Sequence, residues 1–378
     1  MVSNNNNFPF LIFSSITEDT GHLILDDFFW FSNLIERFPN TRIITSETSA
    51  KNILVKYSDY KKNVTSFKDF PVLKKINYRL HLLGRLIFCE KIRNSRIIFQ
   101  GFDELGLLFY LLKIWGKNNL LYVVPTNNVS PERLNKSKWI LQWMLKKIIN
   151  NSNFFLYHTD FEFRLIESEI CNNTHALEKC KKLKYHLIGA SQEKINLEKN
   201  GENNIISFFG PTMQSKPYFD ICKLIKADNY GNGKFEYRFI NLSFQVLNEI
   251  QLLFGKADKI IFINEFLEHK LYINLIAQST YIFLPHNHLY EGKLSGILSD
   301  CISVGTPIIS NRIDPVLEFF NYYGDMGFIY DFSRDVDWEY SFLCQFEKIN
   351  YKDFILSMEK CKSDHSPNKI IEEFLACH

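Results

Sequence analysis

Residues 281–310 read YIFLPHNHLYEGKLSGILSDCISVGTPIIS, and the order of apolar and polar residues in this stretch decides the fold. An apolar run ends at Leu284, a polar loop follows, and Ser295-Gly296 opens a segment with apolar residues at helical spacing. The segment ends at Gly305-Thr306-Pro307, a sequence typical of a helix end, and a second apolar run comes next. The stretch therefore predicts a strand, a loop, a helix and a second strand.

The rest of the chain shows the same alternation of short apolar runs and longer segments with helical spacing. The expected strands of the first half are Phe10–Ser14, Arg42–Thr45, Arg96–Gln100, Leu120–Val124, Asn153–Tyr157 and Tyr185–Ile188. Those of the second half are Ile205–Phe209, Tyr237–Ile240, Lys259–Ile263, Tyr281–Leu284 and Thr306–Ser310. Strands that alternate with helices favour parallel, doubly wound sheets. The pattern predicts two similar α/β domains in tandem.

The chain has 378 residues, which is longer than one ordinary domain. Residues 196–204 (NLEKNGENN) are polar and contain glycine, as linkers do. We therefore place the N-terminal domain at 1–195, the linker at 196–204 and the C-terminal domain at 205–363. Ser366-Pro367 is typical of a helix start, so we expect a last helix in 364–378, with packing against the first domain as one option.

Composition and cysteine usage exclude several classes of protein. The formal net charge is +2, so no overall basic field indicates nucleic acid. The eight cysteines are scattered without a C-x-x-C pair, which speaks against a zinc site and against a disulfide framework. No Lys or Arg precedes the first apolar run, and no stretch approaches the ~20 apolar residues of a spanning helix. We expect a cytoplasmic protein, with peripheral binding to the inner face of the plasma membrane as an option.

The helix start at Ser295-Gly296 is the strongest candidate for an anion site. Ligands of open α/β sheets bind at the carboxyl ends of strands, and a helix that begins there directs free N–H groups and its positive dipole end at the ligand. Glycine lets a phosphate approach closely, and the Ser295 hydroxyl can add a donor. Glu291 is an acceptor suited to sugar or ribose hydroxyls. The alternative is that Ser295-Gly296 is only a helix start and that Glu291 is a solvated loop acid.

This segment resembles the donor-sugar site of GT-B-fold glycosyltransferases of the group 1 (family 4) class. In that class a strand ended by proline, a Glu-Gly loop, a helix and a Gly-x-Pro turn bind the nucleotide sugar. Tyr290-Glu291-Gly292 and Gly305-Thr306-Pro307 match this frame. The resemblance implies an α/β fold of two Rossmann-like, doubly wound domains that face each other across a cleft. It also implies a nucleotide-sugar donor, UDP- or GDP-linked, and no cofactor.

The acidic positions differ from the main pattern of the family. Its two glutamates are separated by seven residues, but position 299 here is Ser, and counting back from Gly305 places the acid at Asp300. Ser295-Gly296 followed by Asp300 is closer to a divergent branch, in which Tyr290 and Lys293 match a tyrosine and a basic residue. Whether Glu291 or Asp300 fills the acidic role is left open by the sequence.

A second match lies at the start of the same domain. The run Ile205–Gly210 ends a strand, and Lys216 follows six residues later. Family members place a basic pair here that binds the donor diphosphate. Lys216 matches the second member of the pair, while the first falls on Pro211. A lysine after a glycine turn can neutralise part of a diphosphate, and a solvent-exposed loop lysine is the alternative. The resemblance covers about residues 205–320.

Over the first domain the resemblance is architectural only. His22 lies in the loop that faces the cleft in GT-B enzymes, where some inverting members use a histidine as general base. Asp103 and Glu104 follow the expected strand Arg96–Gln100 and are further candidates for a base or for binding the acceptor. The alternatives are a histidine that packs at a helix start and first-turn acids that interact with the helix dipole.

Residues 131–149 suggest a membrane-facing helix. At 100° per residue, Trp139 and Trp143 fall opposite the apolar face. Their neighbours on that side are Lys136, Lys146 and Lys147. Outward tryptophan beside outward lysine is typical of a helix that rests on an anionic membrane surface. A contact between helices or an ordinary surface patch is the alternative.

Together these features predict a glycosyltransferase of the hexosyltransferase type. It would transfer a sugar from a nucleotide-sugar donor to a glycan or lipid-linked acceptor, and the resemblance places it in bacterial surface polysaccharide or glycolipid synthesis. Lys216 and the helix start at Ser295-Gly296 would hold the diphosphate, so we expect a metal-independent mechanism. The resemblance favours retention of configuration, whereas a His22 base would favour inversion.

Three other functions are compatible with the pattern. A nucleotide-sugar epimerase of the same fold would need no acceptor. A two-domain solute-binding module would share the architecture without chemistry, although the expected lack of a signal peptide speaks against it. An inactive homologue would explain the departures at the acidic and basic positions.

Overall fold

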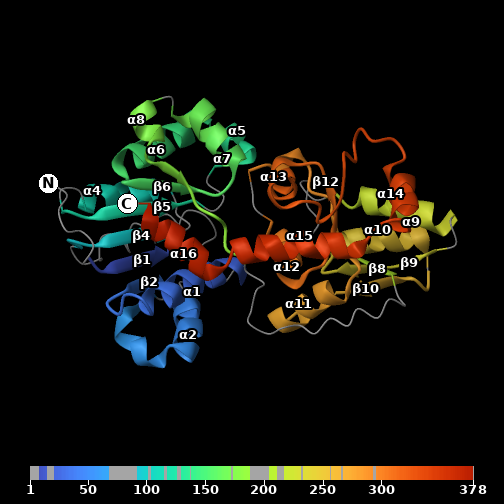
Figure 1. Ribbon diagram of the computed structural model, residues 1–378, viewed down its shortest axis with the longest axis horizontal. Coiled ribbons are helices and arrows are strands. Elements are labelled where there is room, and N and C mark those ends of the chain that lie inside the picture. Colours follow the sequence, from blue (N-terminus) through green and yellow to red (C-terminus); the bar gives the residue numbers. More distant parts are fainter. Residues whose placement is uncertain are drawn as a thin grey trace. The chain divides into compact units, whose positions relative to one another are not determined.

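The computed structural model (Figure 1) describes most of the chain, with gaps between the described ranges. These are 8–14, 21–67, 92–100, 104–114, 117–125, 129–136, 138–171, 173–187, 204–210, 217–230, 233–255, 257–264, 267–292 and 295–377. The chain divides into two compact units, Met1–Tyr185 with Pro367–His378 and His186–Ser366. The second unit thus begins ahead of the linker expected at 196–204, and residues 196–203 lie outside the described ranges.

The first unit is built on a parallel seven-stranded sheet of order β3-β2-β1-β4-β5-β6-β7. The strands are β1 (Phe10–Ser14), β2 (Arg42–Ser46), β3 (Val64–Phe67), β4 (Arg96–Gln100), β5 (Leu120–Val124), β6 (Phe154–Tyr157) and β7 (Cys180–Lys182). Successive side chains of β1 enter opposite cores, with Leu11 and Phe13 on one face and Phe10 and Ile12 on the other. Burial of both faces explains why these strands are continuous apolar runs.

One predicted strand of this sheet, Tyr185–Ile188, was wrong, and two strands of the sheet were missed. The segment 185–187 is not a strand, and the outermost strand is β7, which reads CKK. An edge strand carries charged residues that block further pairing, so β7 lacks the apolar pattern that reveals a buried strand. β3, at the other edge of the sheet, was not expected either.

Helices cover both faces of the first sheet. They are α1 (Gly21–Ile35), α2 (Glu47–Lys56), η2 (Ser58–Asn63), α4 (Glu104–Ile114), α5 (Pro131–Lys136), α6 (Lys138–Asn151), α7 (Asp160–Leu165), the π-helical turn η3 (Ile166–Ile170), α8 (Thr174–Leu177) and α16 (Pro367–Ala376). The last helix, α16, lies beside α1 although it comes from the other end of the chain (Figure 1). Its Phe374 ring packs on Trp30 and Tyr122, at centroid distances of 4.9 and 5.0 Å. Residues 367–378 therefore belong to the first unit.

The second unit has a parallel six-stranded sheet of order β10-β9-β8-β11-β12-β13. The strands are β8 (Asn204–Phe209), β9 (Phe235–Ile240), β10 (Ile260–Ile263), β11 (Tyr281–Leu284), β12 (Ile308–Asn311) and β13 (Gly327–Tyr330). Its helices are α9 (Phe219–Tyr230), α10 (Phe244–Phe254), α11 (His269–Gln278), η4 (His288–Tyr290), α12 (Gly296–Val304), α13 (Asp314–Tyr323), α14 (Trp338–Phe346) and α15 (Tyr351–Asp364). Apolar cores lie on both faces of this sheet too. The expected α/β class with two doubly wound parallel sheets is confirmed.

The two sheets share the position at which the strand order reverses. In the first, β1 is followed in sequence by β2 on one side and is paired with β4 on the other. In the second, β8 is followed by β9 and is paired with β11. The carboxyl ends of strands at such a reversal are where open α/β sheets bind ligands. Each unit therefore has one sheet edge at which a site is expected.

Candidate functional site

Ser295 caps the N-terminus of α12, the helix that follows β11. Its side chain accepts a hydrogen bond from the Leu298 N–H at 3.3 Å. The N–H groups of Gly296 and Ile297 have no acceptor within the helix, because they belong to its first turn. At the other end, Gly305 ends the helix with φ +72°, a left-handed conformation that favours glycine. The expected order of strand, loop, helix and strand is confirmed.

The loop between β11 and α12 is anchored by two stacked rings. His286 is buried, and its ring lies parallel to that of Tyr290 with a centroid separation of 3.8 Å. Burial raises the pKa of Tyr290, and a side-chain hydrogen bond with Ser295 acts in the opposite direction. Tyr290 therefore connects the loop directly to the cap of α12.

Asp300 lies in the second turn of α12 and is fully buried. The hydroxyl of Tyr272, on α11, donates a hydrogen bond to Asp300 Oδ2 at 2.9 Å. The other oxygen, Oδ1, is buried and has no hydrogen-bond partner among the described residues. Burial raises the pKa of Asp300 to about 7, and the hydrogen bond from Tyr272 works against that rise. The carboxyl group thus changes protonation near neutral pH.

Glu291 occupies a different environment, in the turn before α12. It is partly exposed, so its carboxylate meets solvent, whereas that of Asp300 does not. Burial raises the pKa of Glu291, and the charge of Asp314 adds to the rise. The two acids that the sequence could not separate therefore differ in access to solvent, while burial raises the pKa of both.

Gly210 directly follows β8 at the same edge of the sheet. Its N–H donates to the Ile240 carbonyl at 2.7 Å, so the chain of Gly210 lies against the end of β9. A Cβ atom at this position would lie 2.2 Å from the carbonyl oxygen of Asn241. Glycine is therefore required by the close approach of the two chains. Lys216 and Lys293, the two basic residues expected at the donor site, lie outside the described residues.

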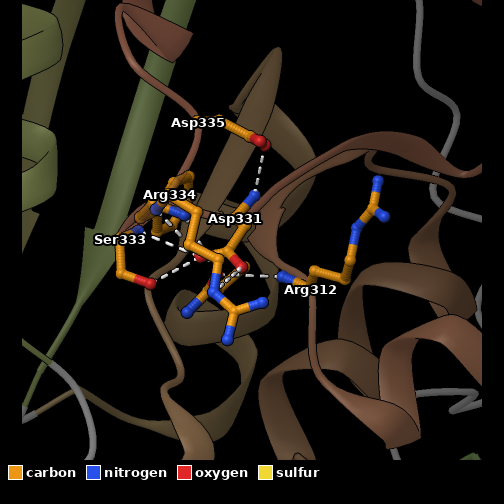
Figure 2. Close-up of polar contacts among 7 residues, drawn as sticks. Arg312, Asp331, Ser333, Arg334 and Asp335 are labelled. Carbon is orange, nitrogen blue, oxygen red and sulfur yellow. Dashed lines mark hydrogen bonds and ion pairs between the residues drawn. The ribbon is translucent and has the colours of Figure 1, made fainter.

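Polar contacts also organise the carboxyl ends of β12 and β13 (Figure 2). The Asn311 side-chain oxygen accepts from the N–H groups of Arg312, at 3.0 Å, and Phe332, at 3.2 Å. Asp331 accepts from the N–H and the hydroxyl of Ser333, at 3.1 and 2.6 Å, and these hydrogen bonds hold its pKa below the usual value. The guanidinium group of Arg312 points away from Asp331 (Figure 2).

The loop after β13 contains an Asp-x-Asp sequence, Asp335-Val336-Asp337. Carboxylate oxygens are ligands that divalent cations prefer, so the contacts of these two acids bear on whether a metal could bind here. The Asp335 carboxylate accepts the Asp331 N–H at 2.6 Å, and Asp337 immediately precedes α14. Within the described ranges, no group of three or more His, Cys, Asp or Glu side chains is arranged to hold a metal ion.

In the first unit, Glu104 begins α4 at the carboxyl end of β4. It is 2% exposed and forms an ion pair with Arg133 at 3.0 Å. This is the arrangement expected of a structural first-turn acid. His22 is the second residue of α1, but its side chain is not described, and Asp103 lies outside the described residues. Of the three residues predicted in this unit, the structure therefore describes the side chain of Glu104, and His22 and Asp103 stay predictions.

No family model matches the sequence, and no curated protein matches it. Solved structures match it over almost the whole chain. Anabaena Alr3699/HepE in complex with UDP has a TM-score of 0.66 at 12% identity, with 98% of this chain and 100% of that chain covered. The apo form of WaaB, the lipopolysaccharide outer core galactosyltransferase, has a TM-score of 0.65 at 12% identity, with 98% of both chains covered. An α,α-trehalose-phosphate synthase (UDP-forming) from Burkholderia vietnamiensis has 0.64 at 8%, also with 98% of both covered.

These neighbours are GT-B glycosyltransferases, and the match extends over both units. The chain has the GT-B fold. The expectation drawn from residues 281–310 is thereby confirmed at the level of architecture. At 8–12% identity the similarity carries the fold and not the activity.

The GT-B scaffold places the two tryptophans of α6 on the surface, as expected. Trp139 is 76% exposed and Trp143 is 54% exposed. Lys146 and Lys147 are also exposed, and Lys138 forms an ion pair with Glu169 at 3.1 Å. In the described part of the chain, no helix has the length and apolarity that crossing a membrane requires.

Tyr272 is a residue beside the candidate site that the sequence analysis missed. It lies in the first turn of α11, and its only sequence signal is an aromatic residue on an amphipathic helix. Nothing in the spacing of residues links position 272 to Asp300, because their contact depends on how α11 packs on α12.

Proposed function

We propose that the protein is a glycosyltransferase that transfers a sugar from a nucleotide-sugar donor to a glycan or lipid-linked acceptor. The observation that carries this proposal is the capped start of α12 with a buried carboxylate one turn further on, at the strand reversal of a GT-B sheet. Structural neighbours with the same fold include complexes of Alr3699/HepE with UDP and with UDP-glucose.

The donor diphosphate would lie at the N-terminus of α12. Ser295 already uses its side chain to cap Leu298, so the N–H groups of Gly296 and Ile297 are the backbone donors left for a phosphate oxygen. Lys216 and Lys293 would supply positive charge. This arrangement supports a metal-independent mechanism, in which the helix start and the lysines take over the charge-neutralising role of a cation.

Hydroxyl groups of the donor would be bound by the two acids. Asp300 Oδ1 is an acceptor without a partner among the described residues, and Glu291 is the accessible acid of the preceding turn. Gly210 keeps the end of β8 close to β9, so that the chain towards Lys216 starts at the sheet edge. In the first unit, His22 and Asp103 are our candidates for the general base. Glu104 is not, since it is buried in an ion pair.

We place the acceptor at a membrane. The pair of exposed tryptophans beside exposed lysines on α6 supports contact with an anionic bilayer, where a lipid-linked glycan would be presented. Surface polysaccharide or glycolipid synthesis is the setting that this arrangement fits.

The test is binding and turnover with a panel of UDP- and GDP-linked hexoses. We expect one donor to bind and to be slowly hydrolysed, with rates unchanged by EDTA. Lys216→Ala should weaken binding, because it removes a charge-assisted contact, whereas the exposed Lys352→Ala should not. If no donor binds and Lys216→Ala changes nothing, the proposal is wrong. Epimer formation from the donor alone would show an isomerase instead.

A further inference from the structure

Tyr272 is held in place by contacts on three sides. Its ring meets that of Phe209 edge-on, with centroids 5.3 Å apart, and stacks on His269 at 6.3 Å. Its hydroxyl donates to Asp300. Phe209 is the last residue of β8 and directly precedes Gly210. Tyr272 therefore joins the end of β8 to the second turn of α12, across the edge where the donor site is proposed.

The hydrogen bond from Tyr272 leaves the carboxyl group of Asp300 with two unlike oxygens. Oδ2 accepts from the tyrosine, while Oδ1 is buried without a partner among the described residues. A buried acceptor with no hydrogen bond destabilises the folded protein, and a ligand hydroxyl that donates to Oδ1 would remove this cost. Side chains of a helix lean towards its N-terminus, which brings the carboxyl group of Asp300 towards the first turn of α12.

We propose that Tyr272 is a positioning residue of the nucleotide-sugar site: it fixes Oδ2 of Asp300 so that Oδ1 is presented as the acceptor for a donor hydroxyl. This inference rests on the proposed function. The tyrosine acts through Asp300 and does not touch the substrate, and its ring is fixed by Phe209 and His269 before any ligand binds. Preorganisation of this kind lowers the entropy that binding would otherwise lose.

The same geometry makes donor binding depend on pH. A hydroxyl donates more strongly to a carboxylate than to a neutral carboxyl group. Burial raises the pKa of Asp300 to about 7 and Tyr272 opposes that rise, so loss of the tyrosine hydroxyl should move the pKa upward. Binding should therefore tighten as the pH rises through 7, and without the hydroxyl it should tighten only at higher pH.

Among the described residues, other ionisable groups near the pair come from four elements. On α11 itself, His269 stacks on the Tyr272 ring, and burial lowers its pKa. Tyr290 of η4 and Cys301 of α12 interact electrostatically with Tyr272, and burial raises the pKa of Tyr290 above 10.0. The charged residue that α15 brings to α12 is Lys362, which donates to the Ser303 carbonyl in the last turn of the helix. Of these groups, the Tyr272 hydroxyl donates a hydrogen bond directly to Asp300. Removing this hydroxyl therefore tests the effect of that hydrogen bond on the pKa of Asp300.

The experiment uses the full chain and the nucleotide sugar that binds best in the panel above. Tyr272→Phe keeps the ring and removes the hydroxyl, and we expect it to weaken binding about tenfold at pH 7 and to shift the pH midpoint upward. The matched control is Tyr351→Phe. Its hydroxyl donates to the Thr280 carbonyl at 3.3 Å, at the amino end of β11, so binding should not change. Thermal unfolding of both variants would establish that they fold.

A double-mutant cycle with Asp300→Asn tests whether Tyr272 acts through Asp300. The two changes should not add, so Tyr272→Phe should have little effect once Asp300 is replaced. If the wild type binds a donor but Tyr272→Phe binds it equally at every pH, or if the two effects add in full, the positioning role is wrong and the proposed function stands. If the wild type binds no donor at all, it is the proposed function that fails.

Discussion

Each unit buries a carboxylate at a comparable place in its sheet, but the two carboxylates have different partners. Glu104 and Asp300 lie on the helices that follow β4 and β11, the strands paired with the first strand of each sheet. Glu104 is 2% exposed and is paired with Arg133 at 3.0 Å. Asp300 is fully buried, and its hydrogen-bond donor is an uncharged tyrosine hydroxyl.

The difference between the two acids indicates what each is for. A buried charge needs a partner of opposite sign, or else it is kept neutral by a raised pKa. Glu104 has a partner of opposite sign, because its carboxylate forms an ion pair with Arg133. Asp300 is the second case, with a pKa raised to about 7 and one oxygen unpartnered among the described residues. Such a group destabilises the fold and retains capacity to bind a ligand, which is the usual compromise at a functional site.

The largest expected effect on stability comes from removing the ion pair between Arg133 and Glu104. Arg133→Met keeps most of the aliphatic length of the side chain and removes the charge, so the buried Glu104 carboxylate loses the 40% exposed guanidinium group that lies 3.0 Å away. We expect the free energy of unfolding to fall by about 2 kcal/mol, because the carboxylate is buried while solvent partly screens the guanidinium group. Chemical denaturation of the full chain would measure it.

The control for that variant is Lys138→Met, in the same unit. Its ion pair with Glu169 spans 3.1 Å, but the two side chains are 60% and 37% exposed. An exposed pair contributes roughly 0–1 kcal/mol, so the change should be small. Equal losses for Arg133→Met and Lys138→Met would mean that Glu104 does not depend on its partner, and the contrast with Asp300 would disappear.

Replacing Asp300 should raise the free energy of unfolding, whereas replacing the partner of Glu104 should lower it. The pKa of Asp300 is about 7 in the folded protein against an ordinary value of 3.8, so between these values the folded state holds a proton that the unfolded state has released. The free energy of unfolding therefore falls as the pH rises through this window and is lowest above 7. Asp300→Asn removes the titration and should stabilise the protein on the order of 2 kcal/mol above pH 7.

Thermal unfolding between pH 4 and pH 9 distinguishes this effect from a general gain in stability. The advantage of Asp300→Asn should shrink towards pH 4, where wild-type Asp300 is protonated in both states. Asp258→Asn, at an exposed position of the same unit, should follow the wild type at every pH. An Asp300→Asn advantage that does not vary with pH would show that the carboxyl group does not titrate near neutrality.

Most strands could be predicted from the sequence, because a strand that is buried on both faces of a sheet is a continuous run of apolar residues. Runs such as Phe10–Ser14 and Tyr281–Leu284 are continuous and apolar, and the structure has strands there. The Ser-Gly pair predicted the start of α12 because N-capping is a local property of the chain. The edge strand β7 was not predicted because it contains two lysines and lacks the apolar pattern of a buried strand. Charged residues on an edge strand prevent pairing with a further strand.

The partners of the two acids could not be predicted from sequence. Arg133 lies 29 positions from Glu104, and Tyr272 lies 28 positions from Asp300, so both contacts depend on tertiary packing. Without the partner, each residue is only an acid at or near a helix start. The sequence could therefore name both Glu104 and Asp300 as candidates but could not separate the neutralised acid from the available one.

The last comparison between the two units is between their surface helices. Changes there should have the smallest effect on stability. The longer of the two described helices between β5 and β6 is α6, with Trp139 and Trp143 exposed beside Lys146 and Lys147. The helix between β12 and β13 is α13, whose sequence DPVLEFFNYY carries two acids and no lysine or arginine. An anionic bilayer should therefore attract α6 and repel α13.

We expect the double variant Trp139→Ala plus Trp143→Ala to change the free energy of unfolding by less than about 0.5 kcal/mol, since both side chains are exposed. It should lower binding to phosphatidylglycerol vesicles roughly tenfold, because each ring loses apolar contact with the interface. Phe219→Ala plus Phe244→Ala is the matched control, with side chains 62% and 75% exposed on the second unit. If this control lowers vesicle binding as much as the tryptophan variant does, exposed aromatic residues bind lipid without regard to their charged neighbours. The lysines beside the tryptophans would then not distinguish α6, and membrane contact would not be a property of the first unit.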